Sequence, residues 1–124
     1  MPQILAVIDD LFFIGKLTGT AKQVGAALQT TTAANFSLDA LRREKPALII
    51  FDLNATSASA LDLIRQLKAD SDLAAIPVVG FFSHVQVELM RAAQDAGCDE
   101  VMPRSKFTAI LPELLRRYAA GHPA

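Results

Sequence analysis

The stretch "PALIIFDLNATSAS", residues 46–59, decides how this chain is expected to fold. Residues 47–51 form a continuous apolar run, which is typical of a strand covered on both faces, as in a parallel sheet between helices. The run ends at Asp52, and small polar residues follow it. Asp52, a carboxylate at the carboxyl end of a buried strand, is therefore a candidate functional residue.

Four further short runs predict four more strands, and helical patterns lie between them. The runs are "QILAVI" (3–8), "ALQTT" (27–31), "PVVGFF" (77–82) and "CDEVM" (98–102). Strands that alternate with helices imply right-handed crossovers and an α/β fold with helices on both faces of the sheet. We therefore predict a flavodoxin-like, doubly wound (βα)5 fold whose five parallel strands follow the order 2-1-3-4-5.

The helix boundaries are predicted from apolar periodicity and from capping residues. The clearest helix covers residues 105–118, and the least regular one covers residues 36–45. Small polar residues favour helix starts, and glycine favours the left-handed residue after a helix end. Four residues are expected to cap helix ends: Ser37, Ser83, Gly97 and Ser105.

Length and composition indicate one soluble domain. The 124 residues are 52% hydrophobic and 20% charged, and no 18-residue apolar run could span a membrane. We expect a core over about residues 3–119 and a frayed tail at 120–124. A formal net charge of −1 predicts neither a nucleic acid nor a membrane surface as a partner. The single Cys98 cannot form an internal disulfide, and no secretory signal pattern is present, which favours a cytoplasmic, bacterial-type setting.

Three aspartates are expected to meet at the carboxyl ends of the first and third strands. Asp9 and Asp10 follow the first strand, and Asp52 ends the third. In the predicted order these strands are neighbours where the strand order reverses, which is where open parallel sheets bind ligands. Two like charges about 4 Å apart repel by roughly 4 kcal/mol at an effective dielectric constant of about 20. Raised pKa values, a basic side chain or a divalent cation would offset this repulsion, and Mg²⁺ is the simplest solution.

Such a site favours phosphoryl transfer, because an aspartate can accept a phosphoryl group covalently beside a metal ion. Two segments resemble motifs of other phosphate-handling enzymes, but neither segment matches its motif fully. "GKLTG" (15–19) lacks the earlier glycine and the following hydroxyl residue that a P-loop needs. "DLNAT" (52–56) resembles the signature of haloacid-dehalogenase-type phosphatases, but Asn54 cannot donate the proton that their second aspartate supplies.

The whole pattern resembles the receiver domain of two-component response regulators, over about residues 3–119. The resemblance rests on the Asp-Asp pair after the first strand, the Asp ending the third, the small-residue loop after the fourth and a basic residue after the fifth. It implies that Asp52 accepts phosphate from a histidine kinase or a phosphotransfer protein, and that the chain is not an enzyme with turnover. It also implies an Mg²⁺ site formed by Asp9, Asp10, Asp52 and the backbone carbonyl of Asn54.

The sequence departs from the family pattern at the positions that transmit the signal. Phe82 stands where the family has a switch Thr or Ser, and Ser83 is a substitute hydroxyl one residue later. Arg104 replaces the phosphate-contacting Lys, and Ser105 replaces the Pro that follows it. Val101 replaces an aromatic residue on the fifth strand. Arg can still contact a phosphate, although its planar fork is not equivalent to a Lys point charge.

The resemblance implies that output passes to a downstream protein through the fourth helix, fifth strand and fifth helix, at about residues 84–118. Because the acceptor and the metal ligands are intact but the switch is altered, three functions stay open. The first is a receiver that is phosphorylated on Asp52 and binds a partner. The second is an interaction module that works without phosphorylation. The third is a phosphate sink that drains a kinase.

Four further residues have roles that the sequence leaves open. Of Phe12 and Phe13, one is expected to pack in the core and the other to line the pocket mouth or a partner surface. Cys98 is expected to behave as a small buried hydrophobe. Arg104 could also be a plain surface charge.

Overall fold

The computed structural model describes residues 3–55, 58–83 and 87–119, and within them strands and helices alternate along the chain. Their order is β1 (Gln3–Val7), α1 (Leu11–Val24), β2 (Ala27–Thr31), α2 (Leu38–Arg43), β3 (Leu48–Asp52), α3 (Ala60–Ala69), β4 (Val78–Phe82), α4 (Val87–Ala96), β5 (Glu100–Pro103) and α5 (Arg104–Ala119). Each predicted strand is present, with bounds that differ by at most two residues. The predicted tail at 120–124 lies outside the described residues, as do residues 84–86 between β4 and α4.

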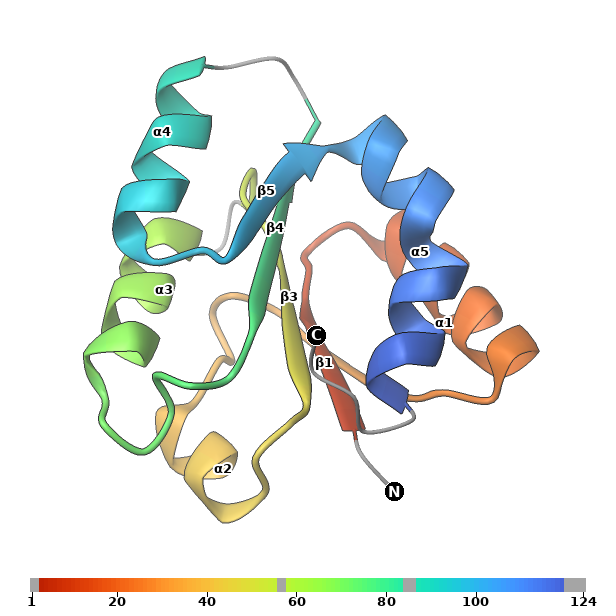
Figure 1. The fold of residues 1–124 in the computed structure, drawn as a ribbon, viewed down its shortest axis with the longest axis horizontal. Coiled ribbons are helices and arrows are strands. Elements are labelled where there is room, and N and C mark those ends of the chain that lie inside the picture. Colours follow the sequence, from red (N-terminus) through yellow and green to blue (C-terminus); the bar gives the residue numbers. More distant parts are fainter. Residues whose placement is uncertain (1–2, 56–57, 84–86, 120–124) are drawn as a thin grey trace.

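The five strands form one parallel sheet in the order β2-β1-β3-β4-β5. Helices α1 and α5 cover one face of the sheet, and α2, α3 and α4 cover the other (Figure 1). The doubly wound fold predicted from the sequence is therefore confirmed. The strand order reverses between β1 and β3, so the carboxyl ends of these strands mark the place where ligands bind in such sheets.

The core is centred on strands β3 and β4, in which every residue is buried. On the face of α1 and α5, three aromatic rings pack together. The ring centroids of Phe13 and Phe81 lie 5.0 Å apart, and Phe81 stacks on Phe107 at 4.7 Å. Such ring pairs contribute about 0.5–1.5 kcal/mol beyond the area that they bury. Because Phe13 and Phe107 lie in the first turns of α1 and α5, this cluster fixes where both helices start.

Of the four predicted caps, two are confirmed and one is wrong, and the cap at Ser83 stays a prediction because residues 84–86 lie outside the described residues. The side chain of Ser37 accepts a hydrogen bond from the N–H of Ala40, and Gly97 has a φ of 114°, in the left-handed region. Ser105, in contrast, lies inside α5. The reason is that β5 runs directly into a helix that already begins at Arg104, so no residue is left between them to serve as a separate cap.

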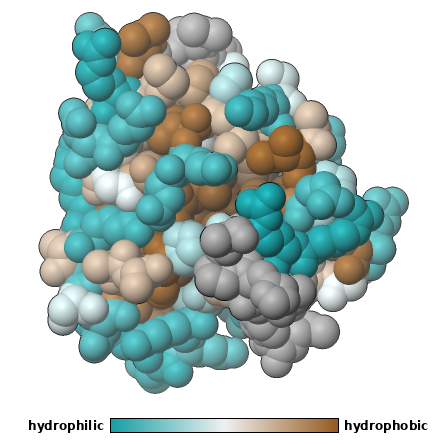
Figure 2. Space-filling model, viewed as in Figure 1, coloured by the Kyte–Doolittle hydropathy of each residue, from teal (hydrophilic) through white to brown (hydrophobic). Residues whose placement is uncertain are grey.

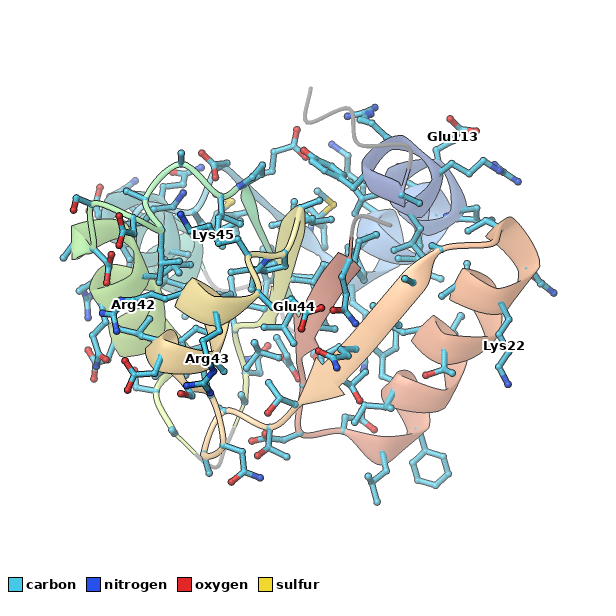
Figure 3. All side chains as sticks on the ribbon, turned by 90° about the horizontal axis from the view of Figure 1, so that it is seen from below. Lys22, Arg42, Arg43, Glu44, Lys45 and Glu113 are labelled. Atoms are coloured by element: carbon cyan, nitrogen blue, oxygen red, sulfur yellow. The ribbon has the colours of Figure 1, made fainter. Side chains whose placement is uncertain are left out.

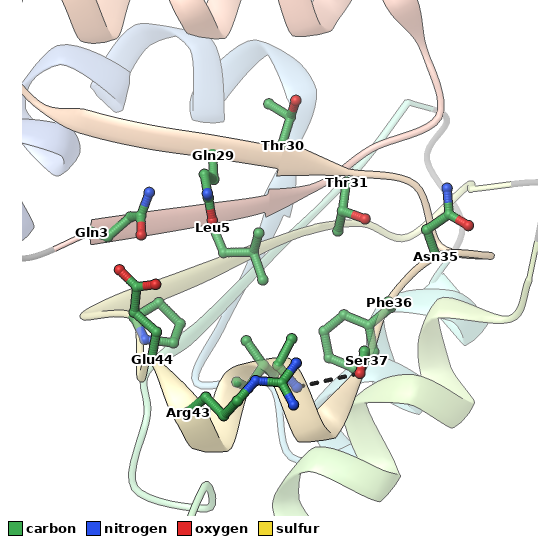
Figure 4. Close-up of a pocket in the computed structure, with 13 residues that line it drawn as sticks. Gln3, Leu5, Gln29, Thr30, Thr31, Asn35, Phe36, Ser37, Arg43 and Glu44 are labelled. Atoms are coloured by element: carbon green, nitrogen blue, oxygen red, sulfur yellow. Dashed lines mark hydrogen bonds between the residues drawn. The ribbon is translucent and has the colours of Figure 1, made fainter.

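Helix α2 is shorter than the predicted range 36–45. Phe36 turns inward onto Phe51, with ring centroids 5.5 Å apart, and Ser37 is extended, so the helix cannot begin earlier. A cavity of about 420 Å³ consequently opens between α2 and strands β1 and β2 (Figure 4). Leu5 and Gln29 are among the residues that line it, and the aspartates predicted to form the site are not.

Charged side chains lie mainly on the outer faces of the helices. Lys22 on α1 and Glu113 on α5 are exposed and point away from the sheet (Figure 3). In the space-filling view, hydrophilic residues cover most of the periphery and apolar residues show between them toward the centre (Figure 2). No helix within the described residues has both the length and the apolar character needed to cross a membrane.

Candidate functional site

Asp52 is the last residue of β3, which places it at the carboxyl end of the sheet. It is 6% exposed, and among the described residues it is the one charged residue that is buried. Burial raises the pKa of Asp52, whereas the hydrogen bond from Asn54 and the charge of Arg104 act in the opposite direction. The charges of Asp9 and Asp10 add to the rise in this pKa. Three charged side chains from other parts of the chain therefore lie within electrostatic reach of the buried carboxylate.

The backbone turns tightly after Asp52. The Oδ1 atom of Asp52 accepts a hydrogen bond from the backbone N–H of Asn54 at 2.9 Å, and its carbonyl oxygen accepts one from Ala55 at 3.1 Å. This is an Asx turn, in which a carboxylate takes the place of a backbone acceptor. The Oδ1 atom of Asn54 in turn accepts a hydrogen bond from the backbone N–H of Ser83 at 2.7 Å. Two hydrogen bonds thus connect the buried carboxylate to the residue that follows β4.

Asp10 uses both of its carboxylate oxygens within the chain. Its Oδ1 accepts hydrogen bonds from the backbone N–H groups of Phe12 at 3.0 Å and Phe13 at 3.3 Å, and so caps α1. Its Oδ2 pairs with the Nη2 atom of Arg104 at 3.0 Å. The hydrogen bond from Arg104 is the largest cause of a lowered pKa for Asp10, and the hydrogen bond from Phe13 comes next.

Arg104 is more than a surface charge, because its guanidinium is held between an acid and aromatic rings. The Cζ atom lies 4.1 Å from the ring centroid of Phe13 and 5.8 Å from that of Phe81. Such cation–π contacts are worth about 0.5–1 kcal/mol at exposed sites and more when water is excluded. The Nε atom of Arg104 is buried without a hydrogen-bond partner. The guanidinium therefore retains an unused donor beside the acidic residues.

Asp9 is engaged on the side of β2, where its Oδ1 accepts a hydrogen bond from the N–H of Ala33 at 3.0 Å. Within the described part of the chain, no three His, Cys, Asp or Glu side chains form a group that could hold a metal ion. The donor chemistry fits Mg²⁺, which prefers carboxylate and carbonyl oxygens. The arrangement does not gather these donors, because Asp10 is held by Arg104 and by α1. The ligand set expected from the sequence therefore stays a prediction.

The structure describes the positions that were expected to transmit a signal. Phe82 is buried among the residues that pack under α3 and α4, and Val101 is half-buried in the same cluster. Ser83 is exposed, and it contacts Asn54 through its backbone N–H. Ser105 is also exposed. A switch based on a Thr hydroxyl and a rotating aromatic ring thus lacks both side chains.

The two phenylalanines after Asp10 separate as expected. Phe13 is 6% exposed within the aromatic cluster, whereas Phe12 is 94% exposed and its neighbour Leu11 is 80% exposed. A shallow cavity of about 300 Å³ lies beside Phe12, between the starts of α1 and α5. Cys98 is buried as predicted, and burial raises the pKa of its thiol to about 12, so the thiol is unreactive near neutral pH.

Reasoning from sequence missed two contacts of this site. The interpretation of Asn54 concerned its backbone carbonyl, whereas in the structure its side chain binds Ser83. No sequence pattern predicts that contact, because it depends on the conformation of the turn after Asp52 and on the position of Ser83 after β4. The second contact is the position of Arg104 over Phe13. A basic residue at the start of the last helix was a partial signal for it.

No family model matches the chain. The transcriptional activator protein ExaE of Pseudomonas putida is 29% identical over 98 residues, which cover 79% of this chain and 45% of that protein. The chain therefore spans less than half the length of this curated relative.

Two solved structures superpose on nearly the whole chain. The phosphorylated cyanobacterial phytochrome response regulator RcpA matches with a TM-score of 0.82 and 19% identity, over 97% of this chain and 95% of that chain. The signal receiver domain of a signal transduction histidine kinase from Syntrophus aciditrophicus matches with a TM-score of 0.82 and 21% identity, over 98% and 92%. At these identities the shared property is the backbone architecture. The chain has the fold of response regulator receiver domains.

Proposed function

We propose that this chain is a response regulator receiver domain that accepts a phosphoryl group on Asp52. The observation that carries the proposal is a buried carboxylate, 6% exposed, at the end of β3 and within reach of charged neighbours. An acid whose pKa is raised by burial at the ligand-binding edge of a sheet is a candidate functional residue. The receiver fold supports the same function. We also propose the cytoplasm of a bacterial cell as its setting.

The proposed reaction is one displacement at phosphorus. A carboxylate oxygen of Asp52 attacks the phosphorus of a phosphohistidine on a histidine kinase or a phosphotransfer protein. A new O–P bond forms, the P–N bond breaks, and the imidazole nitrogen keeps the electron pair. Arg104 contributes positive charge near Asp52, and a guanidinium suits phosphate oxygens. Apart from this step and the later hydrolysis of the acyl phosphate, we propose no enzymatic turnover.

We further propose Mg²⁺ as the metal, held by Asp9, Asp10, Asp52 and the backbone carbonyl of Asn54. When bound, Mg²⁺ supplies positive charge that neutralises the transferring oxygens. The oxygen donors of these residues support this choice. Asp10 would have to leave Arg104 in order to take part, because its two oxygens are otherwise engaged. In this proposal the ring of Phe13 keeps the guanidinium of Arg104 in place while Asp10 exchanges its contact with Arg104 for one with the metal.

Exposed apolar side chains support a protein as the phosphoryl donor in the cell. Leu11 and Phe12 are 80% and 94% exposed and directly follow Asp10. Neighbouring exposed apolar groups of this size favour a surface that another protein covers. For output, we propose a downstream protein that binds the face of α4, β5 and α5, about residues 84–118. A cavity of about 450 Å³ between β5 and α5, with Val101 among its lining residues, supports that surface.

The proposal is tested by intact-protein mass spectrometry. The full chain is incubated with Mg²⁺ and a small acyl phosphate donor, and we expect the mass of one phosphoryl group to be added. Asp52→Asn should abolish the addition, whereas the matched variant Asp95→Asn, at an exposed aspartate on α4, should retain it. An unchanged mass under conditions that phosphorylate a known receiver domain would show that the proposal is wrong.

A second candidate function is an interaction module that works without phosphorylation. The pairing of Arg104 with Asp10 favours it, because this ion pair neutralises one of the acids within the chain. If Mg²⁺ leaves the amide NMR signals of Asp10 and Asn54 unchanged and no phosphoryl mass is added, this second function replaces the first. Added mass with amide shifts confined to these residues would instead indicate a phosphate sink.

A further inference from the structure

The short helix α2 leaves one side chain of the sheet incompletely covered. This helix has six residues, Leu38–Arg43, and it lies on the face of the sheet that carries Leu5 and Val7. Val7 is fully buried, whereas Leu5 is half-buried and lines the cavity of about 420 Å³ that opens between α2 and strands β1 and β2. Because removing apolar surface from water is favourable, this position favours an occupant that covers Leu5.

The lining of this cavity has the make-up of a small-molecule site. Leu5 and the half-buried ring of Phe36 supply apolar surface, and the side chains of Gln29, Thr31 and Asn35 supply hydrogen-bonding groups around it (Figure 4). Sites for small ligands commonly measure about 300–1,000 Å³ and combine apolar walls with a few polar groups that fix the orientation of the ligand. The size and the lining of this cavity therefore fit one small molecule.

Two charged side chains of opposite sign also line the cavity. Arg43 and Glu44 are adjacent at the end of α2, and neither side chain has a hydrogen bond or an ion pair with another described residue. Their neighbour Arg42, in contrast, pairs with both Asp39 and Asp70. In Figure 4 the charged ends of Arg43 and Glu44 lie apart along the opening. An occupant that carries one negative and one positive group would therefore meet a partner for each.

We propose that this cavity binds a small zwitterion with an apolar side chain, the chemical class of the free apolar amino acids. The carboxylate of the ligand pairs with Arg43, because a guanidinium can bind a carboxylate through two parallel hydrogen bonds. The ammonium group of the ligand pairs with Glu44, and its side chain covers Leu5 and Phe36. A purely anionic ligand would be repelled by Glu44, and a purely cationic one by Arg43. The cavity shares no lining residue with the proposed phosphorylation site, so this inference does not rest on the proposed function.

Titration of the full chain with leucine, followed by NMR of the backbone amides, tests this inference. We expect saturable shifts at the amides of Gln29 and Phe36, which line the cavity. Arg43→Met and Glu44→Gln should each weaken binding by about five- to tenfold, which is the loss expected for one charge-assisted hydrogen bond at a partly exposed site. The matched variant Lys45→Met removes an exposed charge beside Glu44 that is not among the residues lining the cavity, and it should bind leucine as the native chain does.

Analogues of leucine assign each charge of the ligand to its partner. Leucinamide lacks the carboxylate, so it should bind the native chain more weakly than leucine does, and Arg43→Met should cause no further loss. N-acetylleucine lacks the ammonium group, and for this ligand Glu44→Gln should cause no further loss. Glycine keeps both charges but has no side chain, so it should bind more weakly than leucine because Leu5 and Phe36 stay uncovered.

Four results would overturn the inference. The first is the absence of saturable shifts at the cavity, and the second is equal affinity for leucine in the native chain, Arg43→Met and Glu44→Gln. The third is equal affinity for glycine and leucine. The fourth is a shift of the same amides with protein concentration alone, which would assign the cavity to a second copy of the chain. Because the titration contains neither a phosphoryl donor nor Mg²⁺, its result is independent of whether Asp52 can be phosphorylated.

Discussion

The two ends of the sheet each hold a half-buried cation, and the hydrogen-bond donors of the two cations are satisfied to different degrees. At the amino end, the Nζ atom of Lys68 donates to the Asp99 carboxylate at 3.2 Å and to two backbone carbonyls at 2.9 and 3.0 Å. At the carboxyl end, Arg104 reaches Asp10 with one nitrogen and leaves its Nε buried without a partner. Fully satisfied polar clusters stiffen a fold, whereas a buried donor without a partner is costly and calls for an explanation such as a functional role.

The network at the amino end also fixes the backbone around it. Asp99 accepts a second hydrogen bond from the N–H of Val78, at 2.7 Å, which holds the start of β4. Gly97 packs so close to Lys68 that a Cβ atom there would lie 2.6 Å from Cγ of the lysine. The amino end is therefore specialised for stability. The carboxyl end retains a buried acid and a buried donor without a partner, and it is the end at which we propose phosphorylation.

The largest effect should come from Lys68→Met, which keeps the aliphatic stem and removes all three donors. We expect a loss of about 2–3 kcal/mol in the free energy of unfolding, because two carbonyls and a carboxylate lose a charged partner. Urea denaturation of both proteins measures this loss. The same substitution at the exposed Lys106 should change stability by no more than about 0.5 kcal/mol. Equal effects at the two lysines would contradict the role given to the amino end.

An intermediate effect should appear in the pH dependence of stability. Because burial raises the pKa of Asp52 in the folded state, the folded chain binds a proton more tightly than the unfolded chain. Stability should therefore fall as the pH rises from the unfolded value of 3.8 through the higher folded pKa. Asp52→Asn should remove this fall and be more stable than the native chain at pH 7. Denaturation curves from pH 4 to pH 7 test this, and parallel pH profiles would refute it.

The smallest effect on stability should come from Arg104→Met, the counterpart of the lysine substitution. The ion pair with Asp10 is about one-third exposed on both sides, and the orphaned Nε disappears with the guanidinium. We expect a midpoint of thermal unfolding within about 2 °C of the native chain. The pKa of Asp10, followed by NMR of its carboxyl carbon, should rise toward its ordinary value because its main hydrogen bond is lost. Destabilisation as large as that of Lys68→Met would remove the distinction between the two ends.

The fold was predictable because its signals are local. The continuous apolar runs that form β3 and β4 are buried throughout. Ser37 caps the start of α2 and Gly97 adopts the left-handed conformation after α4, as their residue types predict. The error at Ser105 arose because a cap was assumed between β5 and α5, whereas the strand leads straight into the helix. Local chemistry alone does not reveal such a direct junction.

The site was predictable in its members but not in their pairings. Strand order alone brings Asp10 and Asp52 to one edge, so the sequence could name them. Whether Asp10 faces a metal, its own helix or Arg104 depends on rotamers and on the ring of Phe13, which no spacing encodes. Likewise, the bond from Ser83 to Asn54 requires the folded turn.

The exposed ring of Phe12 gives this domain a place for an optical reporter. The chain contains no tryptophan, so Phe12→Trp would create a single indole fluorophore. A side chain that is 94% exposed can be enlarged without disturbing the core, and this one lies two residues after Asp10, the acid that pairs with Arg104. The fluorescence emission of this indole would respond to a cation, a phosphoryl group or a docking protein at the site. Each binding event could then be followed in real time without an added dye.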